Sequence, residues 1–270
     1  MHVDEGAGAP IVFIHGLTAT LDFWWPQTAH FAQRHRAIAL DLPGFGRSDK
    51  PDVDYSVHYF VGVLARFLHA KHIARATLVG NSLGGQVAMA FALAHPRAVS
   101  SLVLVSPAGV SAYPRRAISL LLHALALARR GRGGGWKGLP RVPAPTVALL
   151  FKLVFPTRPD KAARFTRFYL AGMESPDYPL YLRAALRAMH GVVRCHMVER
   201  AGEIAAPTLI VWGGKDLLLP VTAAKPLRRR IPGSRLIVYA DAGHCPMIDE
   251  PDRFNRDVEE FLAGGPDTAR

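Results

Sequence analysis

The chain uses few cysteines and has no long hydrophobic run. Its 270 residues include two cysteines, Cys195 and Cys245, and neither stands at a spacing typical of metal ligands. Such sparse use favours a reducing compartment and predicts no metal site. The longest apolar stretch, residues 117–128, is interrupted by Ser119 and His123. It falls short of the ~18–20 apolar residues that span a bilayer, so we expect no transmembrane segment.

Signals for export and for nucleic-acid binding are also missing. The first ten residues, MHVDEGAGAP, are acidic and poor in apolar residues, unlike a secretory signal, and we therefore expect a cytoplasmic protein. The formal net charge is +12, but the basic residues are scattered from Arg34 to Arg270 and form no known nucleic-acid-binding module. We interpret this charge as a composition bias and expect no nucleic-acid partner.

What the chain does contain is a repeated alternation of apolar runs and helix-like segments. Half of the residues are hydrophobic (50%) and 20% are charged, which is typical of a globular protein with a sizeable core. The apolar runs are nearly continuous rather than alternating, as in strands buried on both faces of a parallel sheet. These runs are residues 11–15, 37–41, 76–81, 101–107, 208–214 and 235–243.

Helical patterns separate these runs and complete an α/β arrangement. The sequence predicts helices over residues 24–34, 58–71, 84–95, 222–230 and 252–263. We therefore expect a mostly parallel central sheet flanked by helices on both faces. The fold class is α/β, and its core comprises residues 1–109 and 201–270.

The alternation stops over residues 110–200, which we interpret as a helical insertion on top of the sheet. Helix-like blocks cover residues 115–130, 146–155, 160–173 and 179–189, and no convincing strand lies between them. The connection over residues 130–145 is rich in glycine and proline.

A serine at a strand–helix junction is the first candidate for chemistry. Ser82 lies in "VGNSLGG", directly after a predicted buried strand and before a predicted helix. The pattern Gly80-x-Ser82-x-Gly84 is that of a nucleophile elbow, where side chains at the two glycines would collide with neighbouring backbone. The turn would expose the serine hydroxyl at the carboxyl end of the sheet, where α/β proteins bind ligands.

A serine nucleophile needs a base and an orienting acid, and two later strand ends supply them. "TLIVWGGKD" ends in Asp216, and "RLIVYADAGH" ends in His244. The chain order Ser, Asp, His matches this catalytic template. The alternatives have poorer placement: Asp241 is close to His244 in sequence, Asp249 falls on the next loop, and Ser106 holds another strand end without a carboxylate. The remaining histidines that we considered lack a strand-end setting and are expected on the surface or the insertion; they are His95, His123, His190 and His196.

The oxyanion formed by attack on a carbonyl needs hydrogen-bond donors. We expect the backbone N–H of Leu83, directly after the serine, to be one donor. The loop "HGLT" after the first apolar run should supply the other from the N–H of Leu17, with Gly16 leaving room for substrate. His15 is expected to brace this loop rather than to transfer protons.

These segments together resemble the α/β-hydrolase fold serine hydrolases of the lidded group, which includes carboxylesterases, lipases and carbon–carbon bond hydrolases. The resemblance rests on "FIHGL", "DLPGFGRSDKP", "VGNSLGG", "WGGKD" and "AGHCPMIDEPDRFN", which cover nearly all the chain outside the insertion. The turn at residues 43–46 resembles a structural loop of that family. Only nine residues precede Pro10, so we expect at most one short strand at the N-terminal edge, where the family usually has an antiparallel pair.

The resemblance implies a hydrolase that cleaves carboxylic esters through an acyl-enzyme, without a metal or organic cofactor. A serine at position 82 disfavours halide displacement and epoxide opening, because relatives with those activities have an aspartate there. Leu17-Thr18 and Cys245 stand where carbon–carbon bond hydrolases tend to carry glycines and an aromatic residue. Such a carbon–carbon bond hydrolase is the alternative, and a small-ligand binder without catalysis is the alternative from another class.

The insertion should decide which substrate enters. Its blocks at residues 117–128 and 146–155 are strongly apolar, which predicts a pocket for an apolar acyl group. Arginines flank the first block and would favour weak contact of the insertion with an anionic lipid surface. These arginines are Arg115, Arg116, Arg129, Arg130 and Arg132. The alternative is that the apolar residues pack on the sheet domain while the arginines face water.

Overall fold

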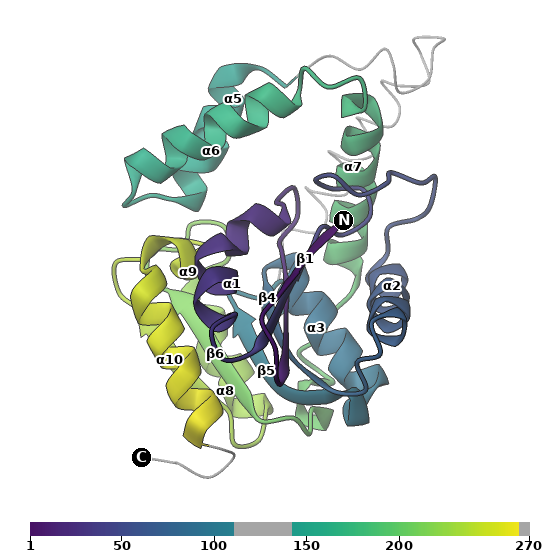
Figure 1. Cartoon of the computed structure of the whole chain (residues 1–270). Coiled ribbons are helices and arrows are strands. Elements are labelled where there is room, and N and C mark those ends of the chain that lie inside the picture. The colour runs from purple at the N-terminus through teal and green to yellow at the C-terminus, as the bar shows by residue number, and fades with distance from the viewer. Residues whose placement is uncertain (111–141, 265–270) are drawn as a thin grey trace.

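A seven-stranded sheet runs through the middle of the molecule (Figure 1). The computed structural model describes residues 1–110 and 142–264. The strand order is β1-β3-β2-β4-β5-β6-β7, and only the β1–β3 pair is antiparallel. Each predicted run overlaps one strand, which confirms the mostly parallel sheet. The strands are β1 (His2–Glu5), β2 (Pro10–Ile14), β3 (Arg36–Leu40), β4 (Ala76–Asn81), β5 (Val99–Val105), β6 (Thr208–Gly213) and β7 (Arg235–Tyr239).

The N-terminal edge of the sheet is the single short strand β1, as expected. Its residues pair with β3 from His2 opposite Leu40 to Glu5 opposite Ala37. Asp4 anchors the edge through ion pairs with Arg36 at 2.9 Å and Lys71 at 3.1 Å.

Helices cover both faces of the sheet and bury its strands from two sides. Along β2, Val12 and Ile14 belong to one hydrophobic cluster while Ile11 and Phe13 belong to the other. This two-sided burial explains why the apolar runs show no polar alternation. The helices of the first face are α2 (Val57–Ala70), α3 (Leu83–Ala94) and α8 (Ala224–Arg230), and those of the second are α1 (Trp25–Phe31), α9 (Pro246–Asp249) and α10 (Pro251–Gly264).

The described part of the insertion is helical, as predicted. It contains α5 (Ala144–Val154), α6 (Pro159–Gly172) and α7 (Tyr178–Arg194). Helices α5 and α6 pack on each other and lie over the sheet domain, while α7 stands beside α2 (Figure 1). The predicted helix at residues 115–130, with His123 and the flanking arginines, lies outside the described residues, as does most of the connection at 130–145.

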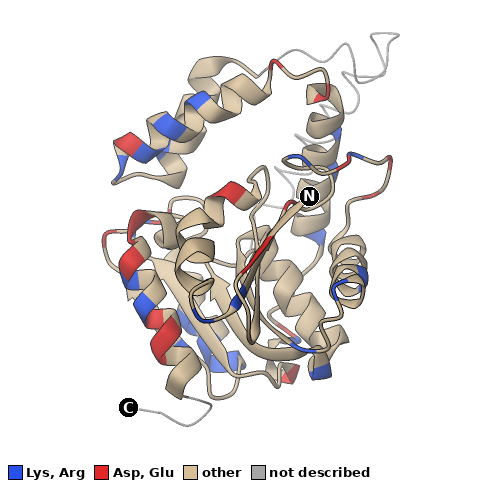
Figure 2. Cartoon of the chain, viewed as in Figure 1, with Lys and Arg blue, Asp and Glu red and all other residues tan. Residues whose placement is uncertain are grey.

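Charged side chains are spread over several helices. Figure 2 shows Lys and Arg on α6, α8 and α10, with Asp and Glu interleaved along α10. Within residues 1–110 and 142–264, no helix is both long and apolar enough to cross a bilayer.

Candidate active site

Ser82 forms the turn between β4 and α3. Its backbone has φ 54° and ψ −116°, and a positive φ is uncommon for a residue other than glycine. The flanking glycines permit the turn: a Cβ on Gly80 would collide with the backbone of Gly84, and a Cβ on Gly84 would collide with the carbonyl oxygen of Ile14. The backbone requirement predicted for both glycines is confirmed, and the serine is held in a strained conformation at the end of a buried strand.

Asp216 and His244 form a buried pair at the ends of the neighbouring strands β6 and β7. The Asp216 Oδ2 atom lies 2.8 Å from His244 Nδ1, and the two residues are 6% and 5% exposed. Because an ionised carboxylate only accepts hydrogen bonds, Nδ1 carries the hydrogen and Nε2 is left as an acceptor. Asp216 Oδ1 accepts from the backbone N–H groups of Leu218 and Leu219, each at 2.9 Å. These bonds fix the carboxylate toward the imidazole.

The loop after β7 turns back over the end of β6, which brings His244 to Asp216. The backbone N–H of Gly214 donates to the Tyr239 carbonyl at 2.7 Å, and that of Lys215 donates to the Ala242 carbonyl at 2.9 Å. Strand adjacency and these two bonds therefore unite residues that are 28 positions apart in the chain.

Asn81 connects the serine turn to the same loop. Its Nδ2 donates to the carbonyl oxygens of Val105 at 3.1 Å and His244 at 3.2 Å. The residue before Ser82 is thus bound to the backbone of His244 itself. No hydrogen bond joins Ser82 Oγ to His244 Nε2 among the described residues, so the two side chains come from connected segments without being paired.

The other acids considered for His244 face elsewhere. Asp241 is exposed and forms an ion pair with Lys215 at 2.7 Å, a hydrogen bond that lowers the pKa of Asp241. Asp249 is buried, and its Oδ2 accepts from the Gly243 backbone N–H at 2.8 Å rather than from the imidazole. Burial raises the pKa of Asp249 to about 6. The carboxylate that faces His244 is therefore that of Asp216.

His15 is a buried structural residue, as expected. Its Nε2 accepts from the Leu42 backbone N–H at 2.9 Å, so Nδ1 carries the hydrogen and donates to the Gly16 carbonyl at 2.7 Å. Burial lowers the pKa of His15, which favours the neutral ring that this arrangement requires. His15 therefore links the loops after β2 and β3. Of the remaining histidines considered, His95 and His190 are exposed and His196 is half-buried, while His123 is outside the described residues.

The loop after β2 lies against the serine turn. A Cβ built on Gly16 would be 3.2 Å from Ser82 Cβ and 3.2 Å from Asn81 Oδ1, so the loop approaches as closely as glycine allows. Neither the Leu17 nor the Leu83 backbone N–H donates a hydrogen bond to a described residue. Leu83 begins α3, where N–H groups lack intrahelical acceptors. The two segments that meet at Ser82 therefore each carry an unpaired main-chain donor.

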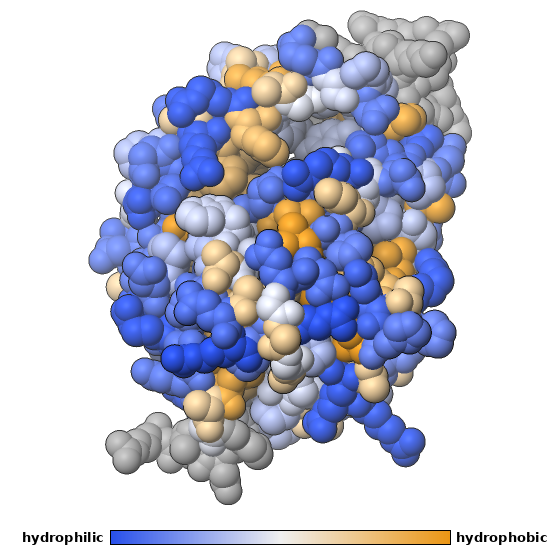
Figure 3. Space-filling model, viewed as in Figure 1, coloured by the Kyte–Doolittle hydropathy of each residue, from blue (hydrophilic) through white to orange (hydrophobic). Residues whose placement is uncertain are grey.

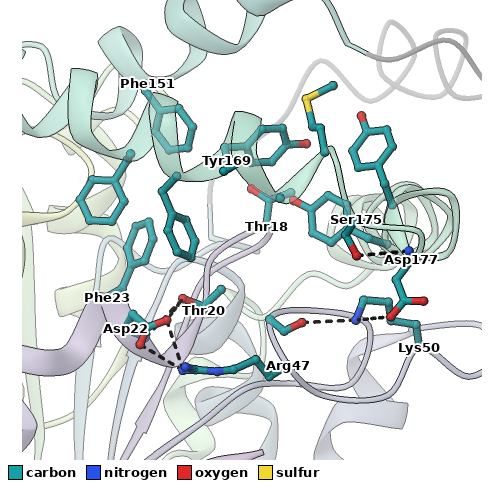
Figure 4. A pocket seen from close by; sticks show the side chains of 18 residues that line it. Thr18, Thr20, Asp22, Phe23, Arg47, Lys50, Phe151, Tyr169, Ser175 and Asp177 are labelled. Carbon is teal, nitrogen blue, oxygen red and sulfur yellow. Dashed lines mark hydrogen bonds and ion pairs between the residues drawn. The ribbon is translucent and has the colours of Figure 1, made fainter.

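A cavity of about 380 Å³ lies between the insertion and the loops after β2 and β3 (Figure 4). Thr18 and Thr20, in the loop after β2, line one side of the cavity. Phe151 is the lining residue from the predicted apolar block at 146–155. The rest of the aromatic wall is Phe23, Phe165, Phe168, Tyr169, Tyr178 and Tyr181. Sequence reasoning missed the contribution of α6 and α7, although their aromatic residues recur three or four positions apart.

The outer surface of the insertion is also partly hydrophobic. Figure 3 shows hydrophobic residues gathered at the α5–α6 end of the molecule beside a hollow. Leu149, Leu150, Phe168 and Leu180 are among the exposed large hydrophobic residues of the described chain.

A short segment between α5 and α6 anchors the insertion on the loop that carries His244. The His244 backbone N–H donates to the Val154 carbonyl at 2.9 Å. Thr157 Oγ1 donates to the Asp241 carbonyl at 2.7 Å, and Arg158 Nη1 donates to the Asp249 carbonyl at 2.7 Å. We call residues 154–158 the anchoring segment. No local sequence pattern predicts this segment, because its hydrogen-bond partners are main-chain groups far away in the sequence.

Neither cysteine belongs to a metal centre in the part of the chain that the structure describes. No group of three or more His, Cys, Asp or Glu residues there could hold a metal ion. Cys195 and Cys245 are both free thiols, and burial raises the pKa of each.

Comparisons with known proteins cover almost the whole chain. A sequence model of the alpha/beta hydrolase fold family matches residues 9–251. An uncharacterized protein of Mycobacterium tuberculosis (strain ATCC 25618 / H37Rv) is 34% identical over 274 residues, covering 95% of this chain and 76% of that protein. The 2-hydroxymuconate semialdehyde hydrolase of Pseudomonas sp. (strain CF600) is 30% identical over 268 residues, covering 96% and 89%. The solved structure of Est816, described as an N-acyl homoserine lactone degrading enzyme, has a TM-score of 0.79 at 28% identity and covers 97% of this chain and 96% of its own.

Proposed function

The chain belongs to the alpha/beta hydrolase fold family, and on that basis we propose that it is a serine hydrolase that cleaves carboxylic esters through an acyl-enzyme intermediate. Family membership supports hydrolase chemistry in general. The ester assignment and the roles of individual residues are our proposal, built on the geometry around Ser82.

The observation that carries this proposal is the buried 2.8 Å hydrogen bond between Asp216 and His244. A carboxylate that orients an imidazole, with the second ring nitrogen left as an acceptor, is the arrangement that activates a nearby hydroxyl. Asn81 donates to the His244 main-chain oxygen at 3.2 Å and directly precedes Ser82, and this link between the two segments supports the assignment of His244 as the base for Ser82.

In the proposed reaction, His244 Nε2 accepts the proton of Ser82 Oγ while that oxygen attacks the acyl carbon. The imidazolium then gives the proton to the leaving alcohol as the carbon–oxygen bond breaks. Asp216 stabilises the charged ring and keeps it in the correct tautomer. Water attacks the acyl-enzyme by the same route, His244 again acting as base and acid, and releases the carboxylic acid.

The main-chain N–H groups of Leu17 and Leu83 are proposed to bind the oxyanion of the tetrahedral intermediate. Both are unpaired among the described residues and lie in segments that adjoin Ser82. Loss of one such donor typically lowers turnover by ~10²–10³-fold.

The aromatic cavity supports an apolar ester substrate. Its aromatic side chains would bury an acyl or alkyl group, and a volume of about 380 Å³ is within the usual range for small-molecule pockets. Est816 is described as an N-acyl homoserine lactone degrading enzyme, and such a compound contains a cyclic ester as well as an amide, so this likeness is compatible with ester chemistry. We expect 4-nitrophenyl esters of short to medium chain length to be preferred. A strict preference for charged or very small acyl groups would contradict an apolar pocket.

Carbon–carbon bond hydrolysis is the second candidate, favoured by the 30% identity to 2-hydroxymuconate semialdehyde hydrolase. The same serine, histidine and aspartate would serve it. The deciding experiment compares kcat/KM for 4-nitrophenyl butyrate and for a ring-fission dienoate, with wild-type protein and Ser82→Ala. Preferred hydrolysis of the ester, abolished by the substitution, supports our proposal, whereas preferred cleavage of the dienoate supports the second candidate. Failure to turn over either substrate, with no covalent labelling of Ser82, would favour a non-catalytic binder.

A further inference from the structure

The aromatic cavity contains buried hydroxyl groups that the proposed chemistry does not use. Tyr178 is 6% exposed, and its hydroxyl oxygen is fully buried without a hydrogen-bond partner among the described residues. The Tyr181 hydroxyl oxygen is likewise buried and makes no hydrogen bond of good geometry, although the side chains of Tyr169 and Thr18 lie close to it. Both residues line the cavity and stack with ring centroids 6.0 Å apart. A buried donor without a well-placed acceptor is destabilising, so such a pair in a pocket wall points to a ligand group.

We propose that these tyrosines donate hydrogen bonds to an acceptor on the substrate. The preferred ester then carries a neutral oxygen, such as that of a ketone or an ether, within its apolar part. This inference rests on the proposed ester hydrolase function and narrows its substrate class. The cavity offers aromatic walls for the hydrocarbon and hydroxyl donors for the oxygen.

The hydroxyls lie close together and act as donors. Tyr169 packs edge-on against Tyr181 at 5.9 Å, and it is close enough to contribute to the raised pKa of Tyr181 after the larger effect of burial. Burial also raises the pKa of Tyr169 to about 12. The phenols of Tyr169 and Tyr181 therefore stay protonated at neutral pH, and each can donate to an acceptor.

The cationic residues at the rim of the aromatic cavity do not make it a binding site for anions. Arg47 is paired with Asp22 at 3.0 Å, and Lys50 donates to the Gly46 carbonyl at 3.2 Å and lies 4.0 Å from Asp177 (Figure 4). The positive charges are thus offset by two carboxylates. A neutral acceptor fits this balance better than a second carboxylate on the substrate.

The loop after β2 connects the tyrosine pair to Ser82, although Ser82 itself does not line the cavity. Gly16 contacts Ser82, and Thr18, two residues further along, lines the cavity and neighbours the Tyr181 hydroxyl. Two residues span at most ~7 Å. The acceptor would therefore be several bonds away from the reacting carbonyl.

Two matched substrate pairs test this inference, because the cavity can receive either side of the ester. One pair is 4-nitrophenyl hexanoate and 4-nitrophenyl 5-oxohexanoate. The other is hexyl butyrate and 5-oxohexyl butyrate, followed by proton release. We expect the oxo group to raise kcat/KM in at least one pair by roughly 3- to 10-fold, the value of one hydrogen bond to a neutral group.

The gain should disappear in Tyr178→Phe/Tyr181→Phe, where the ratio of kcat/KM for the oxo ester to kcat/KM for the plain ester should fall to about 1. This ratio is taken within each variant, so any change in the hydrolysis of plain esters cancels. Removing two hydroxyls without well-placed acceptors should leave the melting temperature equal or higher. Tyr59→Phe is the matched control, because Tyr59 packs on Tyr55 and Phe60 and does not line the cavity. This control should keep the oxo preference.

Absence of an oxo gain in both pairs, or a gain that the double substitution leaves intact, would overturn the inference. If no ester is hydrolysed, the proposed function fails instead, and binding then decides the inference. Acetophenone should raise the melting temperature of wild-type protein more than ethylbenzene does, and the difference should vanish in the double variant. Equal increases in melting temperature with both compounds would refute the proposed hydrogen bond from the tyrosines, whether or not the protein is catalytically active.

Discussion

The side-chain amide of Asn81 donates a hydrogen bond to the main-chain oxygen of His244 at 3.2 Å. The same amide donates to the Val105 carbonyl at 3.1 Å. One side chain thereby fixes the turn of the proposed nucleophile, the neighbouring strand end and the loop of the proposed base. The relative position of nucleophile and base depends on a residue that has no part in bond making.

Asn81→Ala should therefore lower both stability and turnover. The His244 carbonyl would lose the donor that Asn81 supplies, while the Val105 carbonyl would keep the Ser82 backbone N–H at 3.0 Å. We expect the loss to cost about 1–3 kcal/mol of the free energy of unfolding. We expect kcat to fall by at least 10-fold with a smaller change in KM, as measured by urea unfolding and ester hydrolysis. Asn255→Ala is the control, since Asn255 is equally buried but bonds to Gln27 away from the site. Equal losses of kcat in both variants would refute a positioning role.

Asp216→Asn should leave the fold intact and reduce kcat by roughly 10⁴-fold. The amide oxygen can still accept from the Leu218 and Leu219 N–H groups, but the amide nitrogen would donate to the imidazole and favour the wrong tautomer. Circular dichroism and hydrolysis rates check this. Asp241→Asn should retain wild-type activity, because that carboxylate pairs with Lys215 at the surface. A large loss of activity in the Asp241 variant alone would show that Asp241, and not Asp216, is the acid that orients His244.

The raised pKa of Asp249 predicts that the free energy of unfolding depends on pH. Burial raises its pKa in the folded chain to about 6 from 3.8, so the folded state binds more protons than the unfolded state between these values. The contribution of Asp249 to stability should therefore fall as pH rises from about 4 to 6. Asp249→Asn, which keeps an acceptor for the Gly243 N–H, should remove this fall. Urea unfolding at pH 4.5, 5.5 and 7 measures it, and an unchanged difference between variant and wild type across that range would contradict the raised pKa.

Gly243→Ala should disrupt the loop that carries His244. A Cβ at this position would lie 2.5 Å from both the Val154 carbonyl oxygen and Pro156 Cδ in the anchoring segment. Either the loop or the segment must shift, and we expect kcat to fall by at least 10-fold together with the melting temperature. Gly172→Ala, at a helical position where a Cβ meets nothing within 4 Å, should be neutral or stabilising. Wild-type turnover in the Gly243 variant would show that the anchoring segment does not constrain the base.

The fold and the positions of Ser82, Asp216 and His244 at strand ends could be predicted from the sequence. Continuous apolar runs specify strands buried on two faces, and parallel strands bring their carboxyl ends to one edge of the sheet. The strand β4 even begins and ends where the pattern placed it, at residues 76–81.

The contacts that support the site could not be predicted from the sequence, because they depend on packing between segments far apart in the chain. Asn81 reads as the last residue of a strand, and its bond to His244 spans 163 positions. Asp249 was considered only as an alternative acid, whereas its Oδ2 holds the Gly243 N–H. The tyrosines of α6 and α7 gain significance only once those helices are seen to line one cavity with the loop after β2.

Covalent labelling tests the central claim, that Ser82 is an activated nucleophile, most directly. The folded chain is treated with a fluorophosphonate, and the modified peptide is identified by mass spectrometry. Ser106→Ala is the control, since Ser106 is a fully buried serine at the end of the neighbouring strand. We predict one adduct per chain, on Ser82, formed equally in the Ser106 variant and lost in Ser82→Ala and His244→Ala. An unmodified Ser82 in folded wild-type protein, or an adduct that persists without His244, would contradict this account.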